Sequence, residues 1–141
     1  MASPVADVVV VSNPSALAEQ AAQRFVEAAP KALAEFGTFR VALSGGATPQ
    51  SLYARLAAEP FLSRVDWGRV QVFWGDERCV PPDHPDSNYR LAHELLLSKV
   101  HVRPENVYRM RGEAADPDLA AAEYAGELQT EIGRASCRER V

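Results

Sequence analysis

A pair of glycines at the end of an apolar segment is the feature of this sequence best suited to bind a ligand. The apolar residues Val41-Ala42-Leu43 run directly into Ser44-Gly45-Gly46-Ala47-Thr48-Pro49, where a helix is predicted to begin. Glycine gives the main chain angles that other residues avoid and lets a ligand approach closely. A helix start has unpaired N–H groups and the positive end of the helix dipole, both of which suit a phosphate. We therefore predict a phosphate-binding turn formed by Ser44, Gly45, Gly46 and Thr48.

The alternative for this segment is a tight turn between a strand and a helix, in which Thr48 only caps the helix. The spacing matches neither the G-x-G-x-x-G pattern of dinucleotide sites nor the lysine-containing loop of nucleoside triphosphate sites. Both of those ligand classes are therefore disfavoured. A sugar phosphate fits better, because it requires only one phosphate cradle.

A second group of reactive side chains follows the apolar residues 70–74, in the segment Trp74-Gly75-Asp76-Glu77-Arg78. In open parallel sheets, ligands bind beyond the carboxyl ends of the strands, so both groups should open on the same side. Asp76 could orient a sugar hydroxyl or a water, and Arg78 could pair with a phosphate or with charge developing on an oxygen. The alternative is a surface salt bridge among the three charged residues, which contributes little energy.

The remaining histidines and cysteines carry no strong signal. His84 lies in a proline-rich loop and could contact a substrate, but a solvated loop histidine is the simpler interpretation. Cys79 and Cys137 fit neither a disulfide framework nor a zinc or redox spacing. We predict neither a metal nor a cofactor.

Composition indicates an ordinary soluble globular protein with one domain. The chain has 141 residues, of which 47% are hydrophobic and 24% charged, and its formal net charge is −4. A nucleic-acid partner is disfavoured by this charge. The N-terminus lacks the features of a signal peptide and no apolar run approaches the ~20 residues of a membrane helix. We therefore expect a cytoplasmic protein with no membrane partner.

Strand-like and helix-like patterns alternate along the chain and predict an α/β fold. We expect a Rossmann-like, mostly parallel sheet with flanking helices. The predicted strands are residues 8–11, 39–43, 70–74 and 107–110. The predicted helices begin at Asn13-Pro14, Thr48-Pro49, Ser87 and Asp116-Pro117, with Pro30 kinking or splitting the first helix and Gly37 ending it.

The last ten residues, Ile132 to Val141, differ in character from the helix that precedes them. They contain three arginines and no periodicity, and they resemble a translated sequencing adapter; a basic surface terminus is the alternative. We interpret residues 132–141 as a non-native tail. Residues 1–131 are then the N-terminal part of a larger single domain.

Taken in order, the motifs resemble the 6-phosphogluconolactonase family, within the superfamily that also contains the glucosamine-6-phosphate isomerases. The resemblance covers about residues 7–130 and rests on Val41 to Gly46 with Thr48-Pro49, Trp74 to Arg78, Asp83-His84, and Ser87-Asn88-Tyr89. It implies metal-free hydrolysis of 6-phospho-D-glucono-1,5-lactone to 6-phospho-D-gluconate in the oxidative pentose phosphate pathway. It places Ser44, Gly45, Gly46 and Thr48 at the phosphate and Asp76 and Arg78 in the substrate pocket. The whole protein is expected to be a monomer.

One departure from the family pattern is large. The family's second half carries a Gly-x-Asp-Gly-His segment whose histidine is thought to be the general base, and no such segment occurs here. The base is therefore unassigned, and we expect the 141-residue chain itself to be inactive.

Two alternative functions stay open. An aminosugar-phosphate deaminase or isomerase would use Asp76 to remove a proton, although those families usually have tyrosine where this chain has Arg78. The other alternative is a non-catalytic sugar-phosphate sensor.

Overall fold

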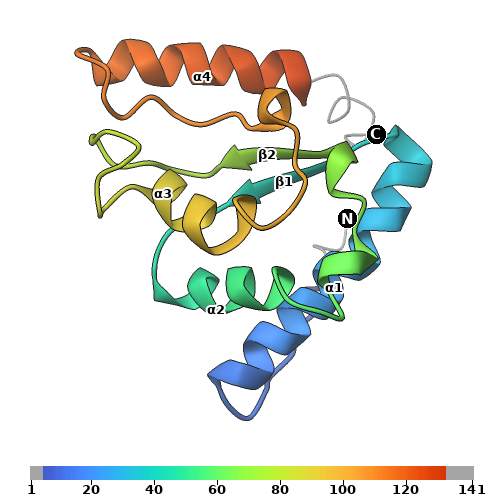
Figure 1. Cartoon of the computed structure of the whole chain (residues 1–141). Coiled ribbons are helices and arrows are strands. Elements are labelled where there is room, and N and C mark those ends of the chain that lie inside the picture. The colour runs from blue at the N-terminus through green and yellow to red at the C-terminus, as the bar shows by residue number, and fades with distance from the viewer. Residues whose placement is uncertain (1–4, 133–141) are drawn as a thin grey trace.

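The computed structural model describes residues 5–132, and two parallel strands form its centre (Figure 1). The helices and strands are α1 (Pro14–Phe36), β1 (Phe39–Leu43), α2 (Ala47–Leu56), β2 (Val70–Trp74), α3 (Asn88–Ala92) and α4 (Pro117–Glu131). A π-helical turn, His93–Leu97, extends α3, and short 3-10 turns occupy Leu62–Arg64, Trp67–Arg69 and Pro104–Asn106. Of the predicted tail, residues 133–141 lie outside the described residues.

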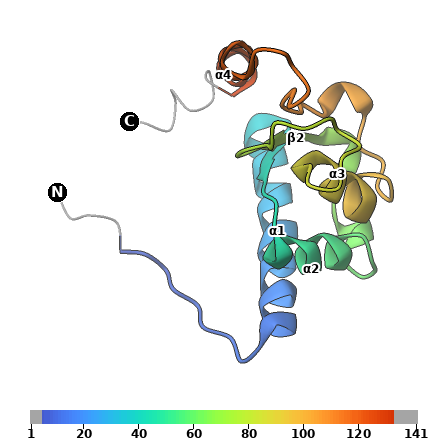
Figure 2. The same ribbon diagram turned by 90° about the vertical axis from the view of Figure 1, so that its left-hand side faces the viewer.

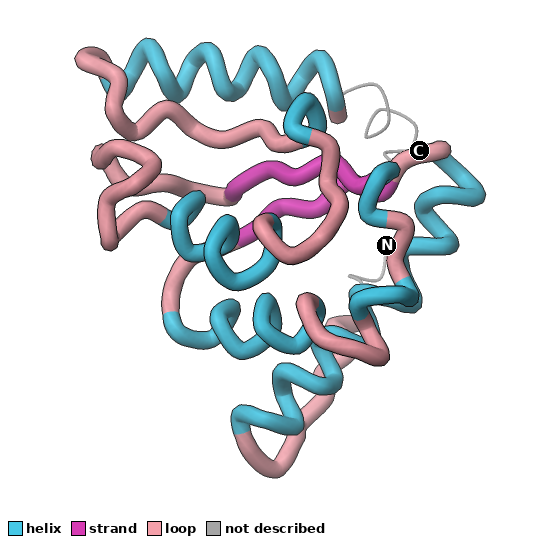
Figure 3. Tube along the Cα trace, viewed as in Figure 1, coloured by secondary structure: helices cyan, strands magenta, loops and turns pink. Residues whose placement is uncertain are grey.

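The sheet pairs β1 with β2 in parallel, from Phe39 opposite Val70 to Leu43 opposite Trp74. A single parallel bridge between Val72 and Val107 continues it on the far side of β2. In Figure 3 the strands lie between α4 and α2, and the turned view in Figure 2 agrees. The prediction of an α/β fold with a parallel sheet is confirmed.

Capping side chains define the ends of α1 and α4 as predicted. The Asn13 side chain accepts a hydrogen bond from Ala16 N at 2.8 Å, and Asp116 accepts from the first amides of α4. Gly37 ends α1 in the left-handed conformation at φ 77°. Of the two outcomes expected at Pro30, a kink or a split, the split is wrong, because α1 is one helix of 23 residues. The buried Val26 and Ala29 before the proline and the half-buried Ala32 and Leu33 after it pack against the same hydrophobic core, which keeps the helix continuous.

Helix α2 does not begin where the sequence suggested. Its N-cap is Gly46, which has φ 100° and no side-chain capping bond, and the first helical residue is Ala47. Thr48 therefore lies inside the first turn rather than capping it. Pro49 follows in that same turn, where the N–H that proline lacks would have no helical partner.

The predicted strand at residues 8–11 is wrong. This segment has no regular structure, and the side chains of Val8 and Val10 are 76% and 88% exposed. Valine favours strands only where a neighbouring strand and a packed face receive it. Among residues 5–132 no strand lies beside this segment, and the blue stretch that precedes α1 runs away from the sheet in Figure 2.

The predicted strand at residues 107–110 forms only one bridge to β2. A tyrosine hydroxyl takes the place of the next main-chain hydrogen bond between the two segments. Tyr108 N donates to Val72 O at 2.8 Å, which starts a parallel ladder. The Tyr124 hydroxyl from α4 then accepts from Trp74 N at 2.9 Å and donates to Tyr108 O at 2.8 Å. The hydroxyl group therefore lies between the two main chains and pairs with the N–H group of Trp74 and the carbonyl oxygen of Tyr108. Tyr124 is 5% exposed, so it also anchors α4 to the sheet.

The other edge of the sheet, along β1, is uncovered. Ala42 is exposed and Val41 is half-buried, and among the described residues no strand pairs with this side of β1. A hollow of about 750 Å³ lies here between α1, β1 and α2. Its lining is mainly apolar and includes Leu17, Phe25, Val41, Leu52 and Leu56. Within residues 5–132, no helix has both the length and the apolar character to cross a membrane.

Substitution of Tyr124 should reveal how much its hydroxyl contributes. Tyr124→Phe keeps the buried ring but leaves Trp74 N and Tyr108 O without their shared partner, so we expect a loss of about 1–3 kcal/mol in the free energy of unfolding. Urea denaturation measures this. Leu119→Ala, an exposed change on the same helix, is the control and should stay within about 0.5 kcal/mol of the unaltered chain. An equal loss of stability in the two variants would contradict the stabilising role of the Tyr124 hydroxyl.

The pairing of Arg109 with Glu113 predicts a pH dependence of stability. Two hydrogen bonds of 2.9 and 2.6 Å join the guanidinium to the carboxylate and lower the pKa of Glu113 from 4.5 to about 2. Because the folded-state pKa is depressed, the pair stabilises the fold above about pH 4.5 and loses this contribution as the pH falls towards 2. With nearly a third of each side chain exposed, we expect less than about 1 kcal/mol. The free energies of unfolding of Glu113→Gln and the unaltered chain should differ at pH 6 and converge as the pH falls through about 2; a constant difference would contradict this.

Candidate functional site

The strand register brings the two predicted motifs to one edge of the sheet. Leu43 is opposite Trp74, and one residue further on Gly75 N donates to Leu43 O at 3.0 Å. The turn after β1 and the loop after β2 therefore start side by side. Figure 1 shows the arrowheads of both strands pointing to this edge.

A tyrosine from α2 holds the beginning of the glycine turn. The Tyr53 hydroxyl accepts from Ser44 N at 3.0 Å and donates to Ser44 O at 2.6 Å. Burial raises the pKa of this phenol, and the hydrogen bond with Ser44 partly opposes that rise. The main chain of Ser44 is thus already occupied, so this residue can offer a ligand only its hydroxyl.

The amides that follow Ser44 are available to a ligand. Within residues 5–132, the N–H groups of Gly45, Gly46 and Ala47 donate no hydrogen bond. The space beside Gly46 is open, since a Cβ atom placed there would have no neighbour within 4 Å. These amides stand at the N-terminus of the ten-residue helix α2. The arrangement can hold an anion by direct hydrogen bonds and by the helix dipole.

The second loop is organised around Glu77, whose importance the sequence did not reveal. Its carboxylate accepts hydrogen bonds from the amides of Asn88 and Tyr89 at 2.7 and 3.0 Å and from the Ser87 hydroxyl at 3.1 Å. It also accepts from its neighbour Arg78 N at 2.8 Å. Glu77 therefore joins the loop after β2 to the start of α3. The three partners at the start of α3 lie ten or more residues along the chain, a separation at which no sequence pattern indicates contact.

Asp76 and Arg78 lie on either side of this anchor and are both exposed. Asp76 accepts a hydrogen bond from Asn88 Nδ2, at 3.3 Å to its Oδ1 and 3.1 Å to its carbonyl oxygen. The Arg78 guanidinium forms neither an ion pair nor a hydrogen bond with any described residue. The alternative interpretation, a salt bridge among the three charged residues, is not observed in the described part of the chain, so Asp76 and Arg78 stay available to a ligand.

Glycine at position 112 lets the Arg78 loop pack closely against the turn that follows residue 110. A Cβ atom at Gly112 would overlap the carbonyl oxygens of Arg78 and Val80. The loop is thus held on one side by Gly112 and on the other by Glu77. This support fixes the main chain of Arg78 while its side chain is free to reach a ligand.

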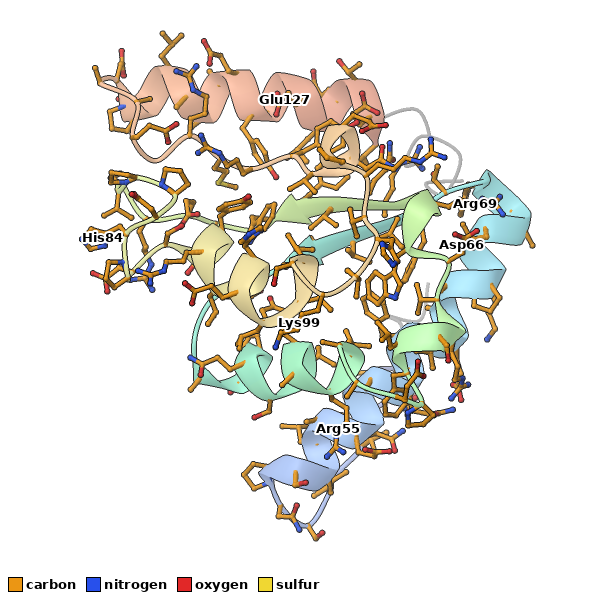
Figure 4. The ribbon with its side chains drawn as sticks, in the orientation of Figure 1. Arg55, Asp66, Arg69, His84, Lys99 and Glu127 are labelled. Atoms are coloured by element: carbon orange, nitrogen blue, oxygen red, sulfur yellow. The ribbon has the colours of Figure 1, made fainter. Side chains whose placement is uncertain are left out.

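The histidines take positions that do not point to catalysis. His84 Nδ1 accepts from Asp86 N at 3.1 Å, and Figure 4 shows its side chain at the outer end of the loop, pointing away from the ribbon. His93 stacks on Tyr89 with ring centroids 5.6 Å apart. His101 is exposed. No three His, Cys, Asp or Glu side chains between residues 5 and 132 are placed together as metal ligands.

Comparison with known proteins shows the family to which this chain belongs. The model of the family "Glucosamine-6-phosphate isomerases/6-phosphogluconolactonase" matches residues 12–139. This chain belongs to that family. A curated relative, the 6-phosphogluconolactonase of the cyanobacterium Synechocystis sp., is 41% identical over 128 residues, which cover 91% of this chain and 51% of the relative.

Solved structures of the family share its fold. The 6-phosphogluconolactonase from Trypanosoma cruzi superposes with a TM-score of 0.76 at 27% identity, covering 89% of this chain and 50% of that protein. A monomeric glucosamine-6-phosphate deaminase gives a TM-score of 0.74 at 16% identity, covering 85% of this chain and 48% of that one, which supports the fold alone. The chain spans about half the length of the relatives it matches.

Removing the Glu77 carboxylate charge should weaken the site's framework. Glu77→Gln keeps the shape but replaces a charged acceptor of several hydrogen bonds with an amide, so we expect a loss of about 2 kcal/mol in the free energy of unfolding. Urea denaturation measures the loss. Glu94→Gln is the matched control, because Glu94 makes one exposed ion pair with Arg90; a loss there as large as at Glu77 would contradict the special role of Glu77.

Proposed function

We propose that the whole protein of which this chain forms part is a 6-phosphogluconolactonase, and that residues 39–88 carry its phosphosugar-binding half. The observation that carries this proposal is the set of free amides at Gly45 to Ala47, on the same sheet edge as Asp76 and Arg78. The close relatives support it, since the Synechocystis protein bears that name. The low identity of the deaminase gives no comparable support to the rival activity.

The chemistry would be transfer of the lactone acyl group to water. The phosphate binds the amides of Gly45, Gly46 and Ala47, with the hydroxyls of Ser44 and Thr48 within the same turn, and this positions the sugar ring. The Arg78 guanidinium neutralises either the phosphate or the oxyanion that forms at the lactone carbonyl.

Asp76 accepts a hydrogen bond from a sugar hydroxyl or from the attacking water. The general base that takes the proton from this water is assigned by the family resemblance to a Gly-x-Asp-Gly-His segment, which residues 1–141 do not contain. Residues 1–141 are therefore proposed to bind the substrate without hydrolysing it.

The proposed setting is a cytoplasmic monomer that acts on a phosphosugar lactone without a metal. Compartment differs among relatives, because a 46% identical protein of Arabidopsis thaliana is named as chloroplastic. The site itself is independent of this difference.

Binding of the product by the chain tests the proposal. Titration of the ¹⁵N-labelled chain with 6-phosphogluconate should shift the amide signals of Gly45, Gly46 and Ala47. Arg78→Ala should weaken binding about tenfold or more through the loss of a charge-assisted contact. Arg69→Ala is the matched control, because Arg69 precedes β2 whereas Arg78 follows it, and Figure 4 shows Arg69 at the opposite end of the sheet from His84.

Two further measurements complete the test. The purified chain should hydrolyse the lactone no faster than buffer does. A chimera in which residues 12–131 replace the matching part of the Synechocystis enzyme should hydrolyse it, and Asp76→Asn should reduce that activity. Ammonia release from glucosamine 6-phosphate by this chimera, without lactone hydrolysis, would instead favour the deaminase. Absence of any shift in the glycine turn would refute the proposed phosphate site.

A further inference from the structure

One buried side chain, that of Asn88, lies between the two loops of the proposed site. Asn88 is 4% exposed and is the first residue of α3. It belongs to neither the glycine turn nor the loop after β2, yet it contacts both. A buried polar side chain in such a position must satisfy its own hydrogen bonds and at the same time determines how the loops are spaced.

On one side, the Asn88 amide is bound to Asp76. Its Nδ2 lies 3.1 Å from the Asp76 carbonyl oxygen and 3.3 Å from the Asp76 Oδ1. These two contacts hold the main chain and the carboxylate of the same residue. They restrict the rotation of the Asp76 side chain, which is otherwise exposed.

On the other side, Asn88 packs directly on the glycine turn. A Cβ atom placed on Gly45 would overlap the Oδ1 and Cγ atoms of Asn88. Glycine is therefore required at position 45 by the volume of the Asn88 side chain, and not by the main-chain angle, because the left-handed glycine of this turn is Gly46.

The position of Asn88 is in turn fixed by the start of α3. Glu77 accepts from Asn88 N at 2.7 Å, and Ser87 caps the helix by accepting from Arg90 N at 3.2 Å. Ser87 is 2% exposed and also donates to Glu77. The main chain of Asn88 is thus held independently of the contacts of its side chain.

We propose that Asn88 is a positioning residue that sets the orientation of the Asp76 carboxylate and its distance from the glycine turn. Asn88 acts through Asp76, which faces the sugar. Loss of the Asn88 amide should leave phosphate binding at Gly45 to Ala47 intact and should remove the preference for a phosphosugar over inorganic phosphate. The predicted change in ligand preference depends on the proposed function. The predicted loss of a fixed Asp76 orientation does not.

The first measurement needs no ligand and uses the full 141-residue chain. Three-bond couplings from ¹⁵N and ¹³C′ to Cγ report whether the Asp76 side chain keeps one χ1 rotamer or averages over several. We expect one rotamer in the unaltered chain and averaging in Asn88→Ala. Asn88→Asp gives a second variant of the same shape, in which the carboxylate cannot donate to Asp76. Asn13→Ala is the matched control, since it removes a capping asparagine from α1 and should leave Asp76 unchanged.

The second measurement compares two ligands, inorganic phosphate and 6-phosphogluconate. In Asn88→Ala, the dissociation constant for phosphate should stay within about twofold, while that for 6-phosphogluconate should rise about tenfold, as expected when one hydrogen-bonding side chain is no longer held in place. If Asn88 had a purely structural role, the dissociation constants for both ligands would rise together. Unchanged Asp76 couplings in both Asn88 variants, or an unchanged ratio of the two constants, would overturn the proposal. If the unaltered chain binds neither ligand, the proposed function fails, and the couplings alone decide the role of Asn88.

Discussion

The parallel pairing of β1 with β2 is the constraint on which the rest of the site depends. Its register ends with Leu43 opposite Trp74, and the bond from Gly75 N to Leu43 O continues it by one residue. Two loops more than thirty residues apart in the sequence therefore leave the sheet together. A slip of one residue would turn the alternating side chains of β2 to the opposite faces and displace Asp76. Since all five residues of β2 are buried, packing on both faces opposes such a slip.

Tyrosine hydroxyls complete this framework where the ladder stops. Tyr53 binds both main-chain groups of Ser44 at the end of β1, and Tyr124 joins Trp74 to Tyr108 at the end of β2. Each hydroxyl both donates and accepts, so it can replace a main-chain contact without leaving a buried group unpaired. Each also ties a helix to the point at which a strand becomes a loop. The loops at the site thus start from fixed positions.

The local patterns predicted most of the elements but little of the network that joins them. The apolar residues of β1 and β2 and the caps at Asn13 and Asp116 were sufficient to place strands and helices. The prediction of a strand at residues 8–11 was wrong because four valines form a strand only beside another strand, and none lies there among the described residues. The prediction of a full strand at residues 107–110 was wrong because the hydroxyl of Tyr124, fourteen or more residues further on, binds the Trp74 N–H group and the Tyr108 carbonyl that would otherwise pair in the sheet.

At the candidate site, sequence reasoning found the groups that face solvent and missed those that hold them. The glycine turn and the charged loop were recognisable because two glycines and three charged residues directly follow the two predicted strands. Glu77 and Asn88 were part of the motifs that carry the family resemblance, but their supporting roles were not predicted, since a carboxylate that binds amides across the loop has the same local sequence as one that faces water. The roles of Ser44, Gly45, Gly46, Thr48, Asp76 and Arg78 remain predictions for experiment.

The open side of β1 has a geometric consequence for the candidate site. In a parallel sheet, every strand delivers the loop that follows it to the same edge. A strand added beside Ala42 would therefore bring its own succeeding loop next to Gly45, and the apolar hollow between α1 and α2 would receive the side chains of that strand. β1 would then become an interior strand, and a side chain at the end of the added strand would face the glycine turn from the side opposite Asp76.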